Sequence, residues 1–141
     1  MMKIPFKKIL GIDSDSSNSI TPPIGIFDPT YLTDVAAALT PDRLTALLDS
    51  YFVHTNGQLN KIEALLASND IEAIAPEAHA LVGSSGSFGA VHFSTLARRL
   101  EQAIKSQQFD TVPVLVADLR KASDRASAAL ADWLKAQPGI N

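Results

Sequence analysis

One short segment of this chain combines residue types that could perform group transfer. It begins with Ala78 and a histidine, His79, and continues through glycines and serines to Gly89. In a helix, Gly83 and Gly86 would follow the histidine by about one and two turns and leave its ring almost without side-chain cover. Glycine in a helix interior costs about 1 kcal/mol relative to alanine. The segment therefore predicts a bare imidazole that another molecule approaches closely.

The next predicted helix supplies groups that could act on this imidazole. Its polar stripe consists of Ser94, Arg98, Glu101 and Lys105. A carboxylate at Glu101 would accept a hydrogen bond from Nδ1–H of His79 and leave Nε2 as a neutral nucleophile. Arg98 and Lys105 would offset the charge of a phosphoryl group on Nε2. These side chains predict a nucleophile, an orienting group and charge partners in one patch.

The elements that must hold this patch are predicted to be helices from Asp28 onward. Asp28-Pro29 and Thr40-Pro41 are start signals, because Asp and Thr cap helices and proline fits the first turn. Pro76 either bends the third helix or lies in its first turn. Apolar residues spaced by three and four indicate helices over 28–39, 41–67, from about 71 to the Gly83–Gly89 segment, 93–104 and 112–133. They predict an all-α fold, an antiparallel up-down-up-down four-helix bundle with a short N-terminal capping helix.

The predicted bundle occupies residues 28–137 of the 141-residue chain. Residues 1–27 contain a polar run, Ser14–Ser19, and two adjacent prolines, a composition that buries little surface, so we interpret them as a flexible N-terminal tail. Within that tail, Lys3–Leu10 is either a frayed terminus or a short docking segment. Residues 138–141 are interpreted as a C-terminal tail.

The composition excludes several classes of protein. The chain has no cysteine, which removes disulfides and cysteine nucleophiles, and its net charge of -3 provides no basic surface for nucleic acid. No apolar run approaches the roughly 20 residues that span a bilayer. We therefore expect a cytoplasmic protein with neither a nucleic-acid nor a membrane partner. His54 and His92 are interpreted as surface residues, and the histidines lack the spacing of a metal site, so we expect no metal.

Residues 78–101 resemble the histidine-containing phosphotransfer (HPt) family of bacterial phosphorelays. That family carries the pattern A-H-x-L-K-G-S-S-x-x-x-G-A, followed by L-x-x-L-x-x-x-L-E. The corresponding residues here are Ala78-His79-Ala80-Leu81-Val82-Gly83-Ser84-Ser85-Gly86-Ser87-Phe88-Gly89-Ala90, then Phe93, Leu96, Leu100 and Glu101. The resemblance, which extends over about 28–136, implies a helical bundle that carries a phosphoryl group. His79 would accept that group from an aspartate of one receiver domain and donate it to another, and Glu101 would orient the imidazole.

The resemblance also implies partners and cofactors. The partners would be response-regulator receiver domains and a hybrid histidine kinase, and the chain would be a monomer without ATP-dependent kinase activity of its own. It would need no cofactor of its own, because the receiver domain supplies Mg²⁺.

One position departs from the family pattern. The family usually has lysine three residues after the histidine, where this chain has Val82. That lysine helps to offset the phosphoryl charge, so we expect Arg98 or Lys105 to compensate for its absence. The predicted phosphoryl- and partner-binding residues are therefore Val82, Gly83, Gly86, Arg98 and Lys105. Val82 also favours an alternative, a degenerate bundle that binds receiver domains or other regulators without chemistry. A third alternative is an autonomous metal-dependent enzyme.

Overall fold

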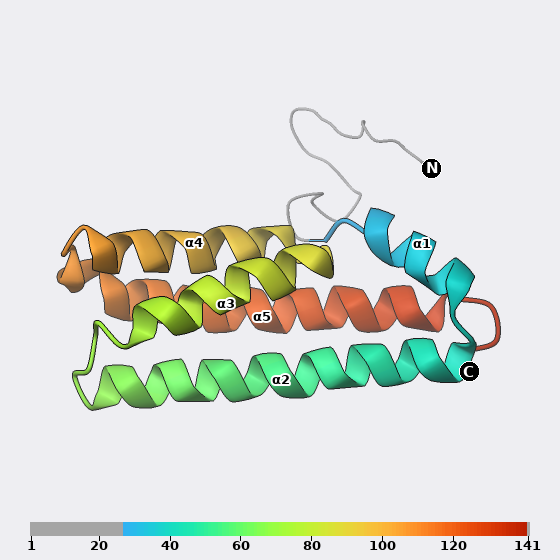
Figure 1. Ribbon diagram of the computed structural model, residues 1–141, viewed down its shortest axis with the longest axis horizontal. Coiled ribbons are helices and arrows are strands. Elements are labelled where there is room, and N and C mark those ends of the chain that lie inside the picture. Colours follow the sequence, from blue (N-terminus) through green and yellow to red (C-terminus); the bar gives the residue numbers. More distant parts are fainter. Residues whose placement is uncertain (1–26, 141) are drawn as a thin grey trace.

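The computed structural model describes residues 27–140. These residues form α1 (Thr30–Ala38), α2 (Pro41–Ala67), α3 (Ile74–Ser87), α4 (Val91–Lys105), the 3-10 turn η1 (Phe109–Thr111) and α5 (Val112–Lys135). No strand occurs in this part of the chain. Helices α2 to α5 run alternately in opposite directions, and α1 lies at one end of the bundle (Figure 1). The predicted all-α bundle with its N-terminal helix is therefore confirmed.

The predicted start signals act largely as expected. The side chain of Thr40 accepts a hydrogen bond from the backbone N–H of Arg43 at 3.3 Å, with proline in the first turn of α2. The start of α1 differs by one residue from the prediction: Pro29 is the N-cap and not the first helical residue, and the Asp28 carboxylate accepts from the backbone N–H of Thr30 at 3.0 Å just ahead of the helix. Pro76 lies in the first turn of α3, where its missing N–H costs no intrahelical hydrogen bond.

The end of α3 differs from the sequence prediction. The helix continues through Gly83 and Gly86 to Ser87, so most of the glycine-serine segment is helical rather than a terminator. Packing explains the difference, because Leu81 and Ser85 on the inner side of these turns are fully buried. Burial of that side outweighs the roughly 1 kcal/mol that each glycine costs in a helix.

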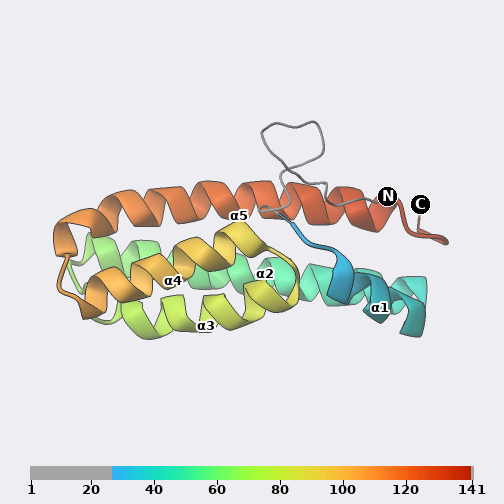
Figure 2. The ribbon, with the colours of Figure 1, turned by 90° about the horizontal axis from the view of Figure 1, so that it is seen from above.

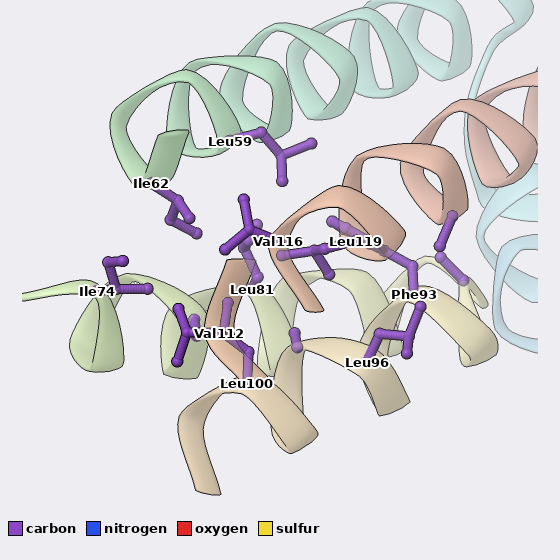
Figure 3. Close-up of a cluster of buried hydrophobic side chains, with 14 of the residues drawn as sticks. Leu59, Ile62, Ile74, Leu81, Phe93, Leu96, Leu100, Val112, Val116 and Leu119 are labelled. Atoms are coloured by element: carbon purple, nitrogen blue, oxygen red, sulfur yellow. The ribbon is translucent and has the colours of Figure 1, made fainter. Parts of the chain in front are cut away.

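The core has two parts that follow from unequal helix lengths. Helices α3 and α4 have 14 and 15 residues, whereas α2 and α5 have 27 and 24. The short hairpin therefore covers one half of the long pair, and α1 covers the other half (Figure 2). The larger cluster, between α2, α3, α4 and α5, includes Leu59, Ile62, Leu81, Phe93, Leu100, Val112 and Leu119 (Figure 3). The smaller cluster consists of Leu32, Leu44, Leu48, Tyr51 and Leu130.

Most of the apolar residues whose spacing by three and four predicted the helices are buried, but some are only half-buried. Those are Leu47, Phe52, Leu65, Leu66, Ile71, Leu115, Ala129 and Trp133. Of the helices over 27–140, none is long and apolar enough to cross a membrane.

Gly89 fixes the turn between α3 and α4. Its φ of +78° lies in the left-handed region that glycine adopts without strain. The backbone N–H of Asp28 donates to the Gly89 carbonyl at 2.7 Å, and a Cβ at Gly89 would overlap the Asp28 carbonyl oxygen. A glycine is thus required both by the backbone angle and by the chain that passes beside it on its way into α1.

Both ends of the described chain contact the bundle. Phe27 packs edge-on against Trp133, with ring centroids 6.4 Å apart, and Gly139 lies against Pro41 at the start of α2. Residues 1–26 and residue 141 lie outside the described residues, and so does the predicted docking segment Lys3–Leu10. The division into tails and bundle stays a prediction.

Candidate functional site

His79 lies in the first half of α3 and faces outward. The neighbouring Ala78 and Leu81 are fully buried, whereas the side chain of His79 is 74% exposed. This contrast follows from helical geometry, because a residue next to the buried stripe is rotated about 100° away from it. The backbone of His79 is therefore fixed within α3, while its imidazole ring is exposed to solvent.

Glu101 comes from α4, the helix that packs most extensively against α3. Its side chain is only 11% exposed, and its Oε2 and Oε1 lie 3.0 Å and 3.2 Å from Nδ1 of His79. The hydrogen bond from Lys105 is the main cause that lowers the pKa of this carboxyl, burial opposes it, and the contact with His79 lowers it further. An ionised Glu101 accepts from Nδ1–H, so the imidazole is held in the tautomer whose Nε2 carries a lone pair.

Lys105 stands one turn after Glu101 on the same helix. Its Nζ donates to Oε2 of Glu101 at 2.7 Å, the same oxygen that faces Nδ1 of His79. Together with Ala75 and Pro76, these three side chains line a shallow pocket of about 340 Å³. The structure therefore brings His79, Glu101 and Lys105 together at the α3–α4 seam.

Arg98 shares this side of α4 but makes no such contact. It is exposed, and no ion pair involves it within residues 27–140. One turn earlier, Ser94 donates its hydroxyl to the Val82 carbonyl at 2.9 Å, which locks α4 against the helix of the histidine. Arg98 thus lies between Ser94 and Glu101 along α4, with its side chain exposed to solvent.

The small residues after His79 leave its side of α3 open. Gly83 is exposed, and a Cβ there would meet nothing within 4 Å, while a Cβ on Gly86 would lie 3.6 Å from the Ser94 hydroxyl. Val82, at the position of the family lysine, is half-buried and packs against the larger core cluster. The charge beside the imidazole therefore comes from α4 and none of it from position 82.

Two ion pairs near the bundle surface are absent from the sequence predictions. Lys61 of α2 pairs with Glu77 of α3 at 3.0 Å, two residues before the histidine. Neither residue is distinguishable from an ordinary solvated charge in the sequence, because the pair depends on the register of α2 against α3.

The second is a cluster built on Arg120 of α5. Its guanidinium donates to both carboxylate oxygens of Glu63, at 3.0 Å and 2.7 Å, and to the side-chain oxygens of Asn56 and Asn60, both at 2.8 Å. The hydrogen bond from Arg120 lowers the pKa of Glu63. The spacing of the three α2 residues puts them on one stripe, but it does not point to Arg120 of α5 as their partner.

The other two histidines do not join the site. His54 is exposed on α2 and His92 is half-buried near the start of α4. Over the described residues, no group of three or more His, Asp or Glu side chains is placed to hold a metal ion.

Comparison with known proteins places this geometry in a family. The sequence model of the Hpt domain matches residues 46–129, which include His79 and Glu101. The crystal structure of histidine-containing phosphotransfer protein B (HptB) from Pseudomonas aeruginosa PAO1 superposes with a TM-score of 0.72 and 20% identity, over 79% of this chain and 96% of that one. At this identity the superposition speaks for the fold, and no protein of curated function matches the sequence. The chain belongs to the Hpt domain family, the phosphotransfer proteins of phosphorelays.

Proposed function

We propose that His79 accepts a phosphoryl group from a receiver-domain aspartate and passes it to the aspartate of another receiver. The observation that carries this proposal is a 74% exposed imidazole whose Nδ1 lies 3.0 Å from a largely buried carboxylate. That arrangement fixes the ring while leaving Nε2 accessible. Within residues 27–140, no side chain or backbone group hydrogen-bonds to Nε2.

Every bond, electron pair and proton in the transfer is accounted for by His79 and the two aspartates, without an additional reagent. The Nε2 lone pair attacks phosphorus, the Nε2–P bond forms, and the P–O bond to the aspartate breaks so that its carboxylate leaves with the electron pair. The ring retains its proton on Nδ1 and becomes cationic, and the negative charge of Glu101 stabilises it. Attack by a second aspartate reverses these changes and returns the neutral imidazole.

The surroundings support an encounter with a folded partner. Ala80, Gly83 and Gly86 are exposed and small, so a receiver domain can bring its active site close to the ring. The exposed Arg98 is positioned to offset the phosphoryl charge that Val82 cannot meet. In this proposal the receiver supplies Mg²⁺ and the acidic pocket, a hybrid histidine kinase stands upstream, and the chain acts as a cytoplasmic monomer without a cofactor of its own.

Phosphotransfer from a panel of phosphorylated receiver domains tests the proposal. We expect acid-labile, base-stable label on the full chain, its loss in His79→Gln, and its retention in the matched control His54→Gln. Label that persists in His79→Gln would show that another residue carries the phosphoryl group. Receivers that bind but never transfer would favour the non-catalytic binding module, for which Val82 is the supporting observation.

A further inference from the structure

Lys105 is exposed, but its ammonium group forms an ion pair with another residue of the chain. Its Nζ lies 2.7 Å from Oε2 of Glu101, and the same oxygen lies 3.0 Å from Nδ1 of His79. The lysine side chain is 66% exposed, whereas the carboxylate is 11% exposed. The ammonium thus approaches the carboxylate from the solvent side while the imidazole contacts it from α3, and one oxygen serves both.

We propose that Lys105 is a positioning residue for phosphoryl transfer, which acts on the His79 ring through the Glu101 carboxylate and not by contact with the phosphoryl group. The inference rests on the proposed function of His79. It gives Lys105 a different task from the one that the sequence suggested, which was to face the phosphoryl charge.

Lys105 is needed because Glu101 must stay ionised. A carboxylate accepts from Nδ1–H, whereas a protonated carboxyl can donate to Nδ1 and favour the tautomer with the proton on Nε2, which has no lone pair for attack. Burial favours the protonated form, so a nearby cation is needed to oppose it. Lys105 supplies this cation and holds the carboxylate in one rotamer.

The other groups around Glu101 cannot replace this cation. On α4, Arg98 is exposed and makes no ion pair in the described part of the chain. Lys61 of α2 is already paired with Glu77 of α3 at 3.0 Å. Helix α5, another neighbour of α4, contributes apolar side chains such as Val112 and Val116 to their shared core. His79 is the remaining contact, and its charge changes during the reaction itself.

A double-mutant cycle separates this inference from direct phosphoryl contact. Loss of one charge-assisted hydrogen bond predicts a transfer rate about tenfold lower in Lys105→Met, with recovery in Lys105→Arg. In a Glu101→Gln background, Lys105→Met should cause no further loss, because the carboxylate that it holds is gone. Equal losses in both backgrounds would overturn the inference and assign Lys105 to the phosphoryl group.

Two further measurements report on the ring itself. In ¹⁵N spectra of the imidazole, Lys105→Met should increase the share of the Nε2–H tautomer, and the acidic limb of the transfer rate should move to higher pH. Lys61→Met is the matched control, since it removes a similarly exposed cation (60%) from an ion pair on the neighbouring helices. We expect it to leave both readouts unchanged.

The outcomes distinguish this inference from the proposed function. Failure of the unsubstituted chain to accept phosphoryl from any receiver would refute the function, whereas the tautomer measurement needs no phosphoryl donor. Normal transfer together with an unchanged tautomer and rate in Lys105→Met would refute the role of Lys105 alone.

Discussion

The bundle contains two hydrogen-bonded clusters built on a carboxylate. They differ in how many hydrogen bonds the carboxylate's partner makes and in how far that partner is exposed. On the α2–α5 side, Arg120 is 27% exposed and donates four hydrogen bonds to Glu63, Asn56 and Asn60. On the α3–α4 side, the side chain of His79 is 74% exposed, and within residues 27–140 its ring hydrogen-bonds only to the carboxylate of Glu101, through one nitrogen.

The difference shows how a small helical domain separates stability from reactivity. Most N–H donors of the Arg120 guanidinium hydrogen-bond to α2 and so join two helices. Few donors remain for an outside molecule. The imidazole of His79 is restrained at a single atom, which sets its direction and leaves its opposite nitrogen unused. A group whose donors are mostly satisfied inside the fold stabilises it, and a group that is half satisfied is available for chemistry.

The largest expected effect comes from closing the open side of His79. Gly83→Leu should lower the phosphotransfer rate about tenfold or more, because the new side chain stands where the partner approaches. Since a Cβ at Gly83 meets nothing within 4 Å, the fold should persist. Gly57→Leu is the matched control, because Gly57 of α2 is a helical glycine with equally open surroundings. Transfer at the normal rate in Gly83→Leu would mean that receivers do not approach over this face.

A smaller effect, on stability alone, is expected from the other cluster. Arg120→Met should lower the free energy of unfolding by about 1–2 kcal/mol, because the acceptors on α2 lose their hydrogen-bond donor at a partly exposed site. Urea denaturation measures this change, and transfer by the folded variant should stay normal. His79→Gln should shift the unfolding free energy by less than about 0.5 kcal/mol. The contrast fails if Arg120→Met slows transfer without changing the urea midpoint.

The smallest effect is in the acid dependence of stability. The pKa of Glu63 is lowered by the hydrogen bond from Arg120, and that of Glu101 mainly by the hydrogen bond from Lys105. A pKa lowered in the folded state means stabilisation that is present above the ordinary value of 4.5 and is lost as pH falls through the folded value. Below about pH 4.5, both Arg120→Met and Lys105→Met should therefore lose stability less steeply than the parent chain. Equal slopes in thermal melts would show that these carboxylates titrate normally.

The sequence was sufficient to predict the arrangement of α3 and α4. Helical periodicity placed His79 beside the buried stripe, and the short connection between the two helices put Glu101 within reach of it. The Glu101–Lys105 contact was not predicted, because the sequence analysis assigned Lys105 to the phosphoryl charge, although a glutamate four residues before a lysine is the favourable order on a helix. The roles of these residues in transfer stay predictions.

The Arg120 cluster was not predictable in the same way. Its partners on α2 lie 57 to 64 residues away along the chain, and their meeting depends on a helix register that the packed core sets. In the sequence, Asn56, Asn60 and Glu63 look like an ordinary solvated face. The end of α3 was mispredicted for a related reason, since the local preference of Gly83 gave way to burial of Leu81 and Ser85.

The contact between Gly89 and Asp28 constrains how this bundle can be joined to other proteins. Position 28 touches the turn that ends α3, and α3 ends roughly 12 Å beyond His79 at 1.5 Å per residue. A domain fused directly ahead of Asp28 would therefore be tethered beside the surface that a receiver would reach in the proposed function. A larger residue in place of Gly89 would force the chain ahead of α1 onto another path, which would move that junction elsewhere on the bundle.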